Sequence, residues 1–303
     1  MKSVKTIIRN SLLVGCIFLT ASCFGKNTKS ETILIGSTPG DDLIKTMLAI
    51  PNQTKVDFIR WNLILDNENV FTLDITYGES KPNTLDFISA EKQTFNGTYS
   101  IVNNREKNGF KEIYQLKSDG LPGIISMTQI SENLFHILTP QNKLMNGNGG
   151  WSYSLNRKVA VDSGEILISS PIPDDKSLQQ VFDGRTPCQE IAAGHPEMKV
   201  SITCFKLKWK LTLNRDSVTH LPTTCTIRTV VDNQPRDVSG TWAIIKGTAT
   251  NPEAIIYKIH ANDLAEPISL LLGDENVLFF LDQDNIPLIG NEDFSFTMNK
   301  RVQ

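Results

Sequence analysis

Hydrophobic and polar residues alternate along much of this chain with the two-residue period of a half-buried β-strand. The pattern is clearest in four segments that are also rich in β-branched residues, 61–65, 70–77, 206–213 and 223–231. Helical periodicity is weak, and short helices are plausible only near 41–50 and 175–182. The pattern therefore predicts an all-β protein.

Two further segments, 151–156 and 294–299, alternate most regularly. Their apolar members are Trp151, Tyr153 and Leu155 in the first segment and Phe294, Phe296 and Met298 in the second. One face of each strand is apolar, so we expect that face to point into a core. A Gly-Asn pair precedes each strand and predicts a tight turn there.

These two strands close the copies of an internal repeat. Residues 97–157 align without a gap with residues 240–300, at a constant offset of 143. Upstream, 36–44 aligns with 184–192 at an offset of 148. Each repeat is about 120 residues long, which is a sufficient size for a domain with its own core.

The repeat predicts two tandem homologous domains, at 33–158 and 180–303. Between them lies a linker at 159–179, whose prolines and charges suit an exposed connection. About six to eight antiparallel strands fit in each repeat, and a set of this size commonly closes into a small β-barrel that leaves no free edge. The predicted fold is therefore two small antiparallel β-barrels in tandem.

The N-terminus has the features of a bacterial lipoprotein signal peptide. Residues 1–22 combine a basic start with an apolar stretch that is too short to span a bilayer. Small residues then lead into Cys23, which we expect to be lipidated by acyl chains such as palmitate. An ordinary secretory signal is the alternative. Residues 23–32 are polar and are interpreted as a tether to the membrane.

The charge of the chain argues against nucleic acid as a partner. The formal net charge is −3 for the whole chain, and removal of the leader with its three basic residues leaves −6. Lysine and arginine form no cluster in the sequence.

Three cysteines remain beyond the lipidation site. Cys188 aligns with Gly40 and Cys204 with Val56, so the first repeat lacks both members of this pair. Paired presence or absence is typical of a disulfide, and an oxidising envelope permits one. We therefore predict a Cys188–Cys204 disulfide, with a metal-thiolate pair as the alternative. Cys225 lies in a predicted strand and is interpreted as a buried free thiol.

The second repeat resembles the N-terminal domain of NlpE-like lipoproteins. The resemblance rests on a Gly-x-x-Pro-Cys turn at 184–188, a Gly-Thr-Trp at 240–242 and an Ile-Tyr strand at 256–259. It implies a lipocalin-like β-barrel and an outer-membrane location, in a family associated with copper homeostasis, surface adhesion and envelope-stress signalling. The Cys-x-x-Cys of that family is absent, because Gln189-Glu190-Ile191 follows Cys188. Copper or redox chemistry linked to that motif therefore does not carry over.

Other candidate sites carry weaker signals. His195 and Met198 are possible copper ligands inside the predicted disulfide loop, but we interpret them as part of a solvated loop. His136 aligns with Phe279 and is interpreted as a half-buried strand residue. Trp61 and Trp209 recur at matching positions and are interpreted as core, with a ligand cavity lined by them as the alternative.

Sequence motifs of hydrolases, metalloproteases, nucleotide-binding loops and calcium loops are absent. We therefore expect a non-enzymatic, cofactor-free envelope lipoprotein, anchored to the membrane by its lipid, that binds a small apolar ligand or an envelope protein through its barrels. The alternative is a lipoprotein for copper or metal handling, or for envelope-stress sensing, that uses Cys188, Cys204, His195 or Met198.

Overall fold

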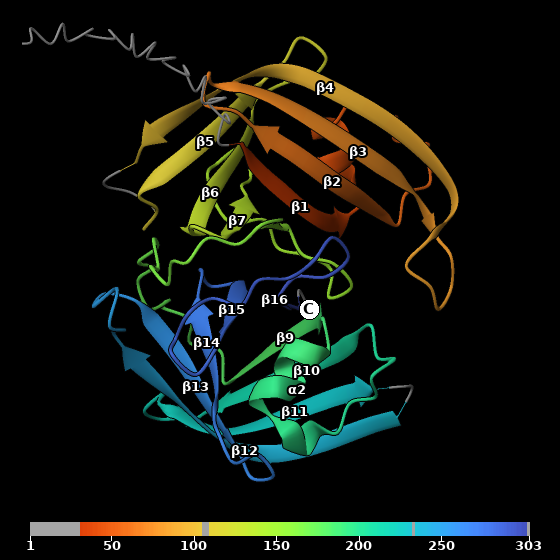
Figure 1. The fold of residues 1–303 in the computed structure, drawn as a ribbon. Helices are drawn as coiled ribbons and strands as arrows, with labels where there is room; N and C mark the ends of the chain where they lie inside the picture. The colour runs from red at the N-terminus through yellow and green to blue at the C-terminus, as the bar shows by residue number, and fades with distance from the viewer. Residues whose placement is uncertain (1–30, 105–108, 232–233, 302–303) are drawn as a thin grey trace, which may run out of the picture.

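A computed structural model describes residues 31–104, 109–231 and 234–301 of this chain. The predicted signal peptide (1–22), the lipidation at Cys23 and most of the tether lie outside these residues. The chain forms two closed antiparallel β-barrels, which lie one above the other in Figure 1. Within the described ranges, no helix has the length and apolar character needed to cross a membrane. The predicted fold class is confirmed.

The first barrel pairs its strands in chain order, and β8 closes the barrel on β1. Helix α1 (Asp42–Met47) follows the first strand, within the predicted helix at 41–50. The strands are β1 (Thr32–Pro39), β2 (Phe58–Leu65), β3 (Val70–Ser80), β4 (Phe87–Asn103), β5 (Glu112–Lys117), β6 (Ile125–Ser131), β7 (Leu134–Ile137) and β8 (Ser154–Arg157).

The second barrel repeats this arrangement, and β16 closes it on β9. Helix α2 (Gln189–Gly194) and the 3₁₀ helix η1 (Pro196–Met198) follow its first strand. The strands are β9 (Gln179–Thr186), β10 (Leu207–Arg215), β11 (Pro222–Val231), β12 (Gln234–Lys246), β13 (Ile255–Ala261), β14 (Ile268–Leu272), β15 (Val277–Leu281) and β16 (Thr297–Lys300).

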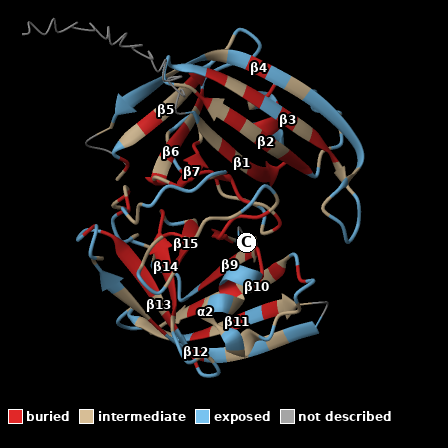
Figure 2. Cartoon of the chain, in the orientation of Figure 1, coloured by how far each residue is buried: buried red, intermediate tan, exposed pale blue. Residues whose placement is uncertain are grey.

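Strand β15 shows how the barrels are packed, because all of its residues are buried. Leu278 and Phe280 belong to the apolar cluster inside the second barrel. Val277, Phe279 and Leu281 point the other way and belong to a separate cluster between the barrels. Figure 2 shows the same burial along β14 and β15. Strands at the junction therefore bury both faces, whereas β4 and β12 are largely exposed.

The cluster between the barrels is a third hydrophobic core. It joins side chains of the first barrel, the linker and the second barrel. Its members are Phe110, Ile113, Ile130, Leu134, Leu138, Leu144, Ile166, Ile168, Ala254, Ile256, Leu271, Val277, Phe279 and Leu281. Apolar burial of this extent is the main force that holds two domains together.

Polar side chains complete the junction, and equivalent residues of the two repeats meet there. The hydroxyl of Ser152 contacts that of Ser295 at 2.6 Å. The hydroxyl of Ser154 contacts that of Thr297 at 2.8 Å. In both pairs the partners are 143 residues apart, which is the offset of the repeat. The polar face of each closing strand is therefore buried against its own copy.

Two backbone contacts are reciprocal in the same way. The amide of Gly147 donates to the Oδ1 of Asn299 at 2.7 Å. The amide of Gly290, which aligns with Gly147, donates to the Oδ1 of Asn156, which aligns with Asn299, at 2.8 Å. Such reciprocity defines a two-fold, isologous interface. The two barrels therefore pack like the subunits of a symmetric dimer that have been joined in one chain.

The linker is only partly the exposed connection that the sequence predicts. Residues 171–177, with their prolines and charges, are largely exposed as expected. Ile166 and Ile168 are fully buried in the cluster between the barrels. The amide of Leu167 also donates to the carbonyl of Ile130 at 2.9 Å. The linker therefore contributes to the junction, because buried and partly exposed residues alternate along 166–170 as in a strand.

The helix expected near 175–182 is wrong. Strand β9 begins there, at Gln179, and pairs with β10 and β16. Closure of the barrel requires a strand at this place, and that pairing overrides a weak local preference for helix.

His136 is more deeply buried than the half-buried position expected from the sequence. Its side chain has no exposed surface. The Nε2 atom donates to the carbonyl of Met145 at 2.9 Å, and Nδ1 lies 3.0 Å from the hydroxyl of Ser154. The ring meets that of Phe279 edge to face. Burial lowers the pKa of His136 from 6.5 to about 4, so the folded protein holds a neutral imidazole.

This histidine predicts a loss of stability in mild acid. Between pH 6.5 and pH 4 the unfolded chain binds a proton that the folded chain excludes, so stability falls as the pH falls. From pH 7.5 to pH 5 the contribution is roughly 2 kcal/mol. In denaturant unfolding at both pH values, His136→Gln removes this part of the loss.

Two comparisons make this test specific. Ser154→Ala removes one hydrogen-bond partner but keeps the histidine, so it retains the wild-type pH slope. Burial raises the pKa of Asp274 to about 6, so this group titrates in the same pH range as His136. Its effect on stability has the opposite sign and is the same in every variant. An unchanged slope in His136→Gln contradicts the assignment.

Candidate functional site

The matching tryptophans are core residues, as predicted. Trp61 and Trp209 are almost completely buried inside the two barrels. The indole Nε1 of Trp61 donates to the hydroxyl of Thr38, and that of Trp209 donates to Thr186, both at 2.9 Å. A cavity beside Trp209 inside the second barrel measures only about 10 Å³. It is too small for a ligand, so side chains fill this barrel interior.

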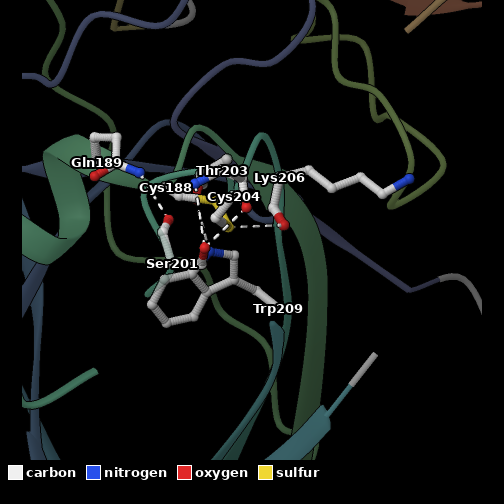
Figure 3. The surroundings of a disulfide bond; sticks show 8 residues. Cys188, Gln189, Ser201, Thr203, Cys204, Lys206 and Trp209 are labelled. Atoms are coloured by element: carbon white, nitrogen blue, oxygen red, sulfur yellow. Dashed lines mark hydrogen bonds between the residues drawn. A yellow bond between two sulfur atoms is a disulfide. The ribbon is translucent and has the colours of Figure 1, made fainter. Parts of the chain in front are cut away.

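The predicted disulfide is confirmed. Cys188 and Cys204 are bonded, with 5.9 Å between their Cα atoms, and both lie in the interior cluster that contains Trp209. Figure 3 shows the bond and the contact beside it, in which the side-chain amide of Gln189 donates to the carbonyl of Ser201 at 3.0 Å. The disulfide ties the start of α2 to the segment that leads into β10.

The first repeat fills the same space without a disulfide. A side chain at Gly40, the counterpart of Cys188, would lie only 2.4 Å from the Cγ1 of Val56, the counterpart of Cys204. Helix α1 is instead fixed by Asp41, whose carboxylate accepts from the amide of Ile44 at 3.0 Å. Helix α2 has no such side-chain cap. The disulfide therefore takes over the anchoring of the helix in the second repeat.

A pocket of about 540 Å³ lies beside α2, where the second barrel opens. We call it the α2 pocket. Its wall includes Phe280 and Ile268 from the barrel interior, together with Ile191 of α2 and Leu288. Its volume falls in the range of small-molecule sites, in which an apolar wall and a few polar groups together select the ligand.

The charges around the α2 pocket are mainly negative. One lysine, Lys258, faces four carboxylates, those of Glu190, Glu266, Asp282 and Asp284. The Asp282 carboxylate also accepts from the amides of Asp284 and Ile286, so it is held in place. An excess of carboxylates favours a ligand that carries positive charge.

His195 lies at the edge of the α2 pocket. It is half-buried, and its Nδ1 atom has no hydrogen-bond partner within the described residues. Burial lowers the pKa of His195, while nearby Glu197 and Glu266 oppose the shift. The ring is therefore neutral at pH 7, and its Nδ1 atom is buried.

The second proposed copper ligand is placed differently. Met198 packs against the interior cluster of the second barrel. Both sulfur atoms of Cys188 and Cys204 are used in the disulfide. Among the described residues, no three histidine, cysteine, aspartate or glutamate side chains converge as metal ligands. Cys225 is a buried thiol whose pKa is raised by burial to about 11, which makes it a poor nucleophile.

Comparison of the chain with protein-family models, with curated proteins and with solved structures gave no match. The function is therefore inferred from the geometry of the molecule and from its sequence.

Most residues of the α2 pocket escape prediction from the sequence. Glu266, Asp282 and Asp284 lie in the turns that follow β13 and β15, and turn residues are commonly acidic. Only closure of the barrel brings these turns to α2. The one available signal was His195, inside the predicted disulfide loop.

Proposed function

We propose that this protein is a non-enzymatic lipoprotein of the bacterial cell envelope that binds a ligand or partner at the α2 pocket. The observation that carries the proposal is the combination of an apolar wall and an excess of carboxylates around the pocket. This combination suits an amphiphile with a cationic head group and a short apolar body.

The envelope location is supported by the sequence. A basic and apolar leader ends at Cys23, and the disulfide of the second barrel suits an oxidising compartment. Lipidation of Cys23 would anchor the protein to the membrane, with an outer-membrane location suggested by the resemblance to NlpE-like lipoproteins. Two tandem barrels agree with that resemblance at the level of the fold.

The absence of catalysis is supported by the chemistry of the α2 pocket. In a catalytic triad, a base activates the nucleophile, and a third residue holds that base in the correct orientation. The free Nδ1 of His195 is not oriented by a described partner. The thiol of Cys225 lies in the barrel interior and is not part of the pocket wall. Ligand binding therefore explains the pocket better than a reaction does.

Octylammonium and octanoate are suitable probes, because they share an apolar tail and differ in charge. In isothermal titration calorimetry of the leader-free protein at pH 7.5, octylammonium is expected to bind and octanoate to bind more weakly. Glu266→Gln should lower the affinity for octylammonium about fivefold, as for loss of an exposed charge interaction of about 1 kcal/mol. Asp119→Asn, a change at an exposed turn of the first barrel, is the matched control and leaves binding unchanged.

Equal binding of both probes, or equal affinity in Glu266→Gln and the control, contradicts the proposal. Titration with copper and zinc addresses metal handling. Sub-micromolar metal binding that is lost in the double variant His195→Ala with Met198→Ala would favour that alternative.

A further inference from the structure

A second cavity, of about 180 Å³, lies at the junction of the two barrels. The turn between β3 and β4, residues 80–85, and the side chains of Phe58 and Trp151 line it from the first barrel. Arg185 and Lys206 line it from the second. We call it the seam cavity. Each repeat contributes to its wall, so it exists only because the barrels are joined in this way.

Aromatic rings hold the cationic side of the seam cavity in place. Phe87, Phe58 and Trp151 form a stack with ring centroids 4.1 and 4.9 Å apart. The guanidinium of Arg185 lies over the far face of this stack, 5.3 Å from the Trp151 ring. The arginine is therefore positioned by stacking, and its N–H donors remain available.

The positive charge at this place is not balanced. Within the described residues, ring contacts alone engage these two side chains: Arg185 lies over Trp151, and the Nζ of Lys206 lies 5.0 Å from the centroid of the Phe205 ring. The carboxylate of Asp293 also lines the seam cavity, but it is paired with Arg60 at 2.5 Å. Burial lowers the pKa of Arg185, and burial together with Arg185 lowers the pKa of Lys206. The two cations are thus half-buried, close to one another and without a counter-charge.

The internal repeat supplies the comparison that explains this imbalance. Asp293, which neutralises Arg60, aligns with Gly150 of the first repeat. A side chain at Gly150 would begin 3.5 Å from the Cζ of Arg185. Gly150 therefore supplies no carboxylate to Arg185, although the aligned residue Asp293 supplies one to Arg60.

We propose that the seam cavity binds a small oxyanion, of phosphate or carboxylate type, between Arg185 and Lys206. The guanidinium fork suits two oxygens of such an anion, and the lysine adds a second charge. The cavity accommodates a group of the size of phosphate or acetate, presented alone or as part of a larger ligand. This site is separate from the α2 pocket, which attracts the opposite charge.

The test uses inorganic phosphate and acetate, titrated calorimetrically into the leader-free protein at constant ionic strength. Binding of either anion in the low millimolar range is expected. The anion that binds more tightly shows whether the site prefers a phosphate or a carboxylate group. Gly150→Asp places a carboxylate beside Arg185, as Asp293 is placed in the other repeat, and should weaken binding about tenfold. Lys206→Gln should weaken it about fivefold without disturbing the turn at Gly150.

Lys92→Gln, at an exposed position of β4, is the control and retains the wild-type affinity. Circular dichroism confirms that each variant is folded before titration. If Gly150→Asp fails this check, Lys206→Gln alone decides. Absence of binding up to 10 mM, on the order of the weakest affinity that two charges would give, overturns the proposal. Equal binding by Lys206→Gln and Lys92→Gln overturns it too.

Discussion

Replacement of Phe279 by alanine is expected to lower the free energy of unfolding by about 3–5 kcal/mol. The ring has no exposed surface and lies in the apolar cluster between the barrels, where it meets His136 at a centroid distance of 5.6 Å. Its removal leaves a cavity. The neighbouring side chains belong to two different barrels, so they cannot move together to fill it. Denaturant unfolding, followed by tryptophan fluorescence, measures the loss.

Ile101→Ala is the matched control for this prediction. Ile101 lies on β4 with 46% of its surface exposed, so its loss should change stability by about 0.5 kcal/mol or less. A loss at Phe279 as small as that at Ile101 would mean that the barrels do not support one another through this cluster.

Removal of the disulfide is expected to lower stability by about 3 kcal/mol in the chain-entropy estimate. The bond closes a loop with a sequence separation of 16 and ties α2 to the start of β10. The double variant Cys188→Ala with Cys204→Ala tests this value in denaturant unfolding. The wild-type protein under reducing conditions should lose a similar amount, because the same cross-link is broken.

A second double variant separates the cross-link from packing. Cys188→Gly with Cys204→Val introduces the pair that occupies these positions in the first repeat, Gly40 and Val56. It should remain less stable than the wild type, because the valine restores packing but not the covalent bond. Free thiols at both Cys188 and Cys204, found by peptide mapping of the unreduced protein, would show that the bond is absent and would remove this prediction.

The architecture was accessible from the sequence for identifiable reasons. Alternation in 61–65 and 206–213 predicts strands because the side chains of a strand point to opposite faces. The repeat then fixes two domains. The disulfide was predictable because Gly40 and Val56 replace both cysteines together.

The junction between the barrels was not accessible in the same way. Ser152 and Ser295 have the polar character of residues that face water, yet both are buried against one another. Nothing in the pattern of one strand distinguishes a polar face in water from a polar face that meets its own copy. The recurrence of these residues in both repeats was the available signal, and it indicates homology as readily as contact.

The two cavities were missed for a related reason. Arg185 and Lys206 are far from Trp151 in the sequence, and only barrel closure and domain packing bring them together. Ser37, which aligns with Arg185 in the first repeat, is uncharged and donates to the carbonyl of Glu292. Comparison of the two repeats residue by residue reveals the difference only after the contacts are known.

The central claim is that equivalent strands of two copied barrels meet across a two-fold interface. The most direct test is oxidation of the double variant Ser152→Cys with Ser295→Cys, whose wild-type hydroxyls lie 2.6 Å apart. Peptide mapping under non-reducing conditions should find these two cysteines linked within one chain, in nearly every molecule. Ser100→Cys with Ser295→Cys, which places one thiol on the exposed β4, should remain unlinked. Free thiols at 152 and 295, or equal linkage in both variants, would contradict the two-fold junction.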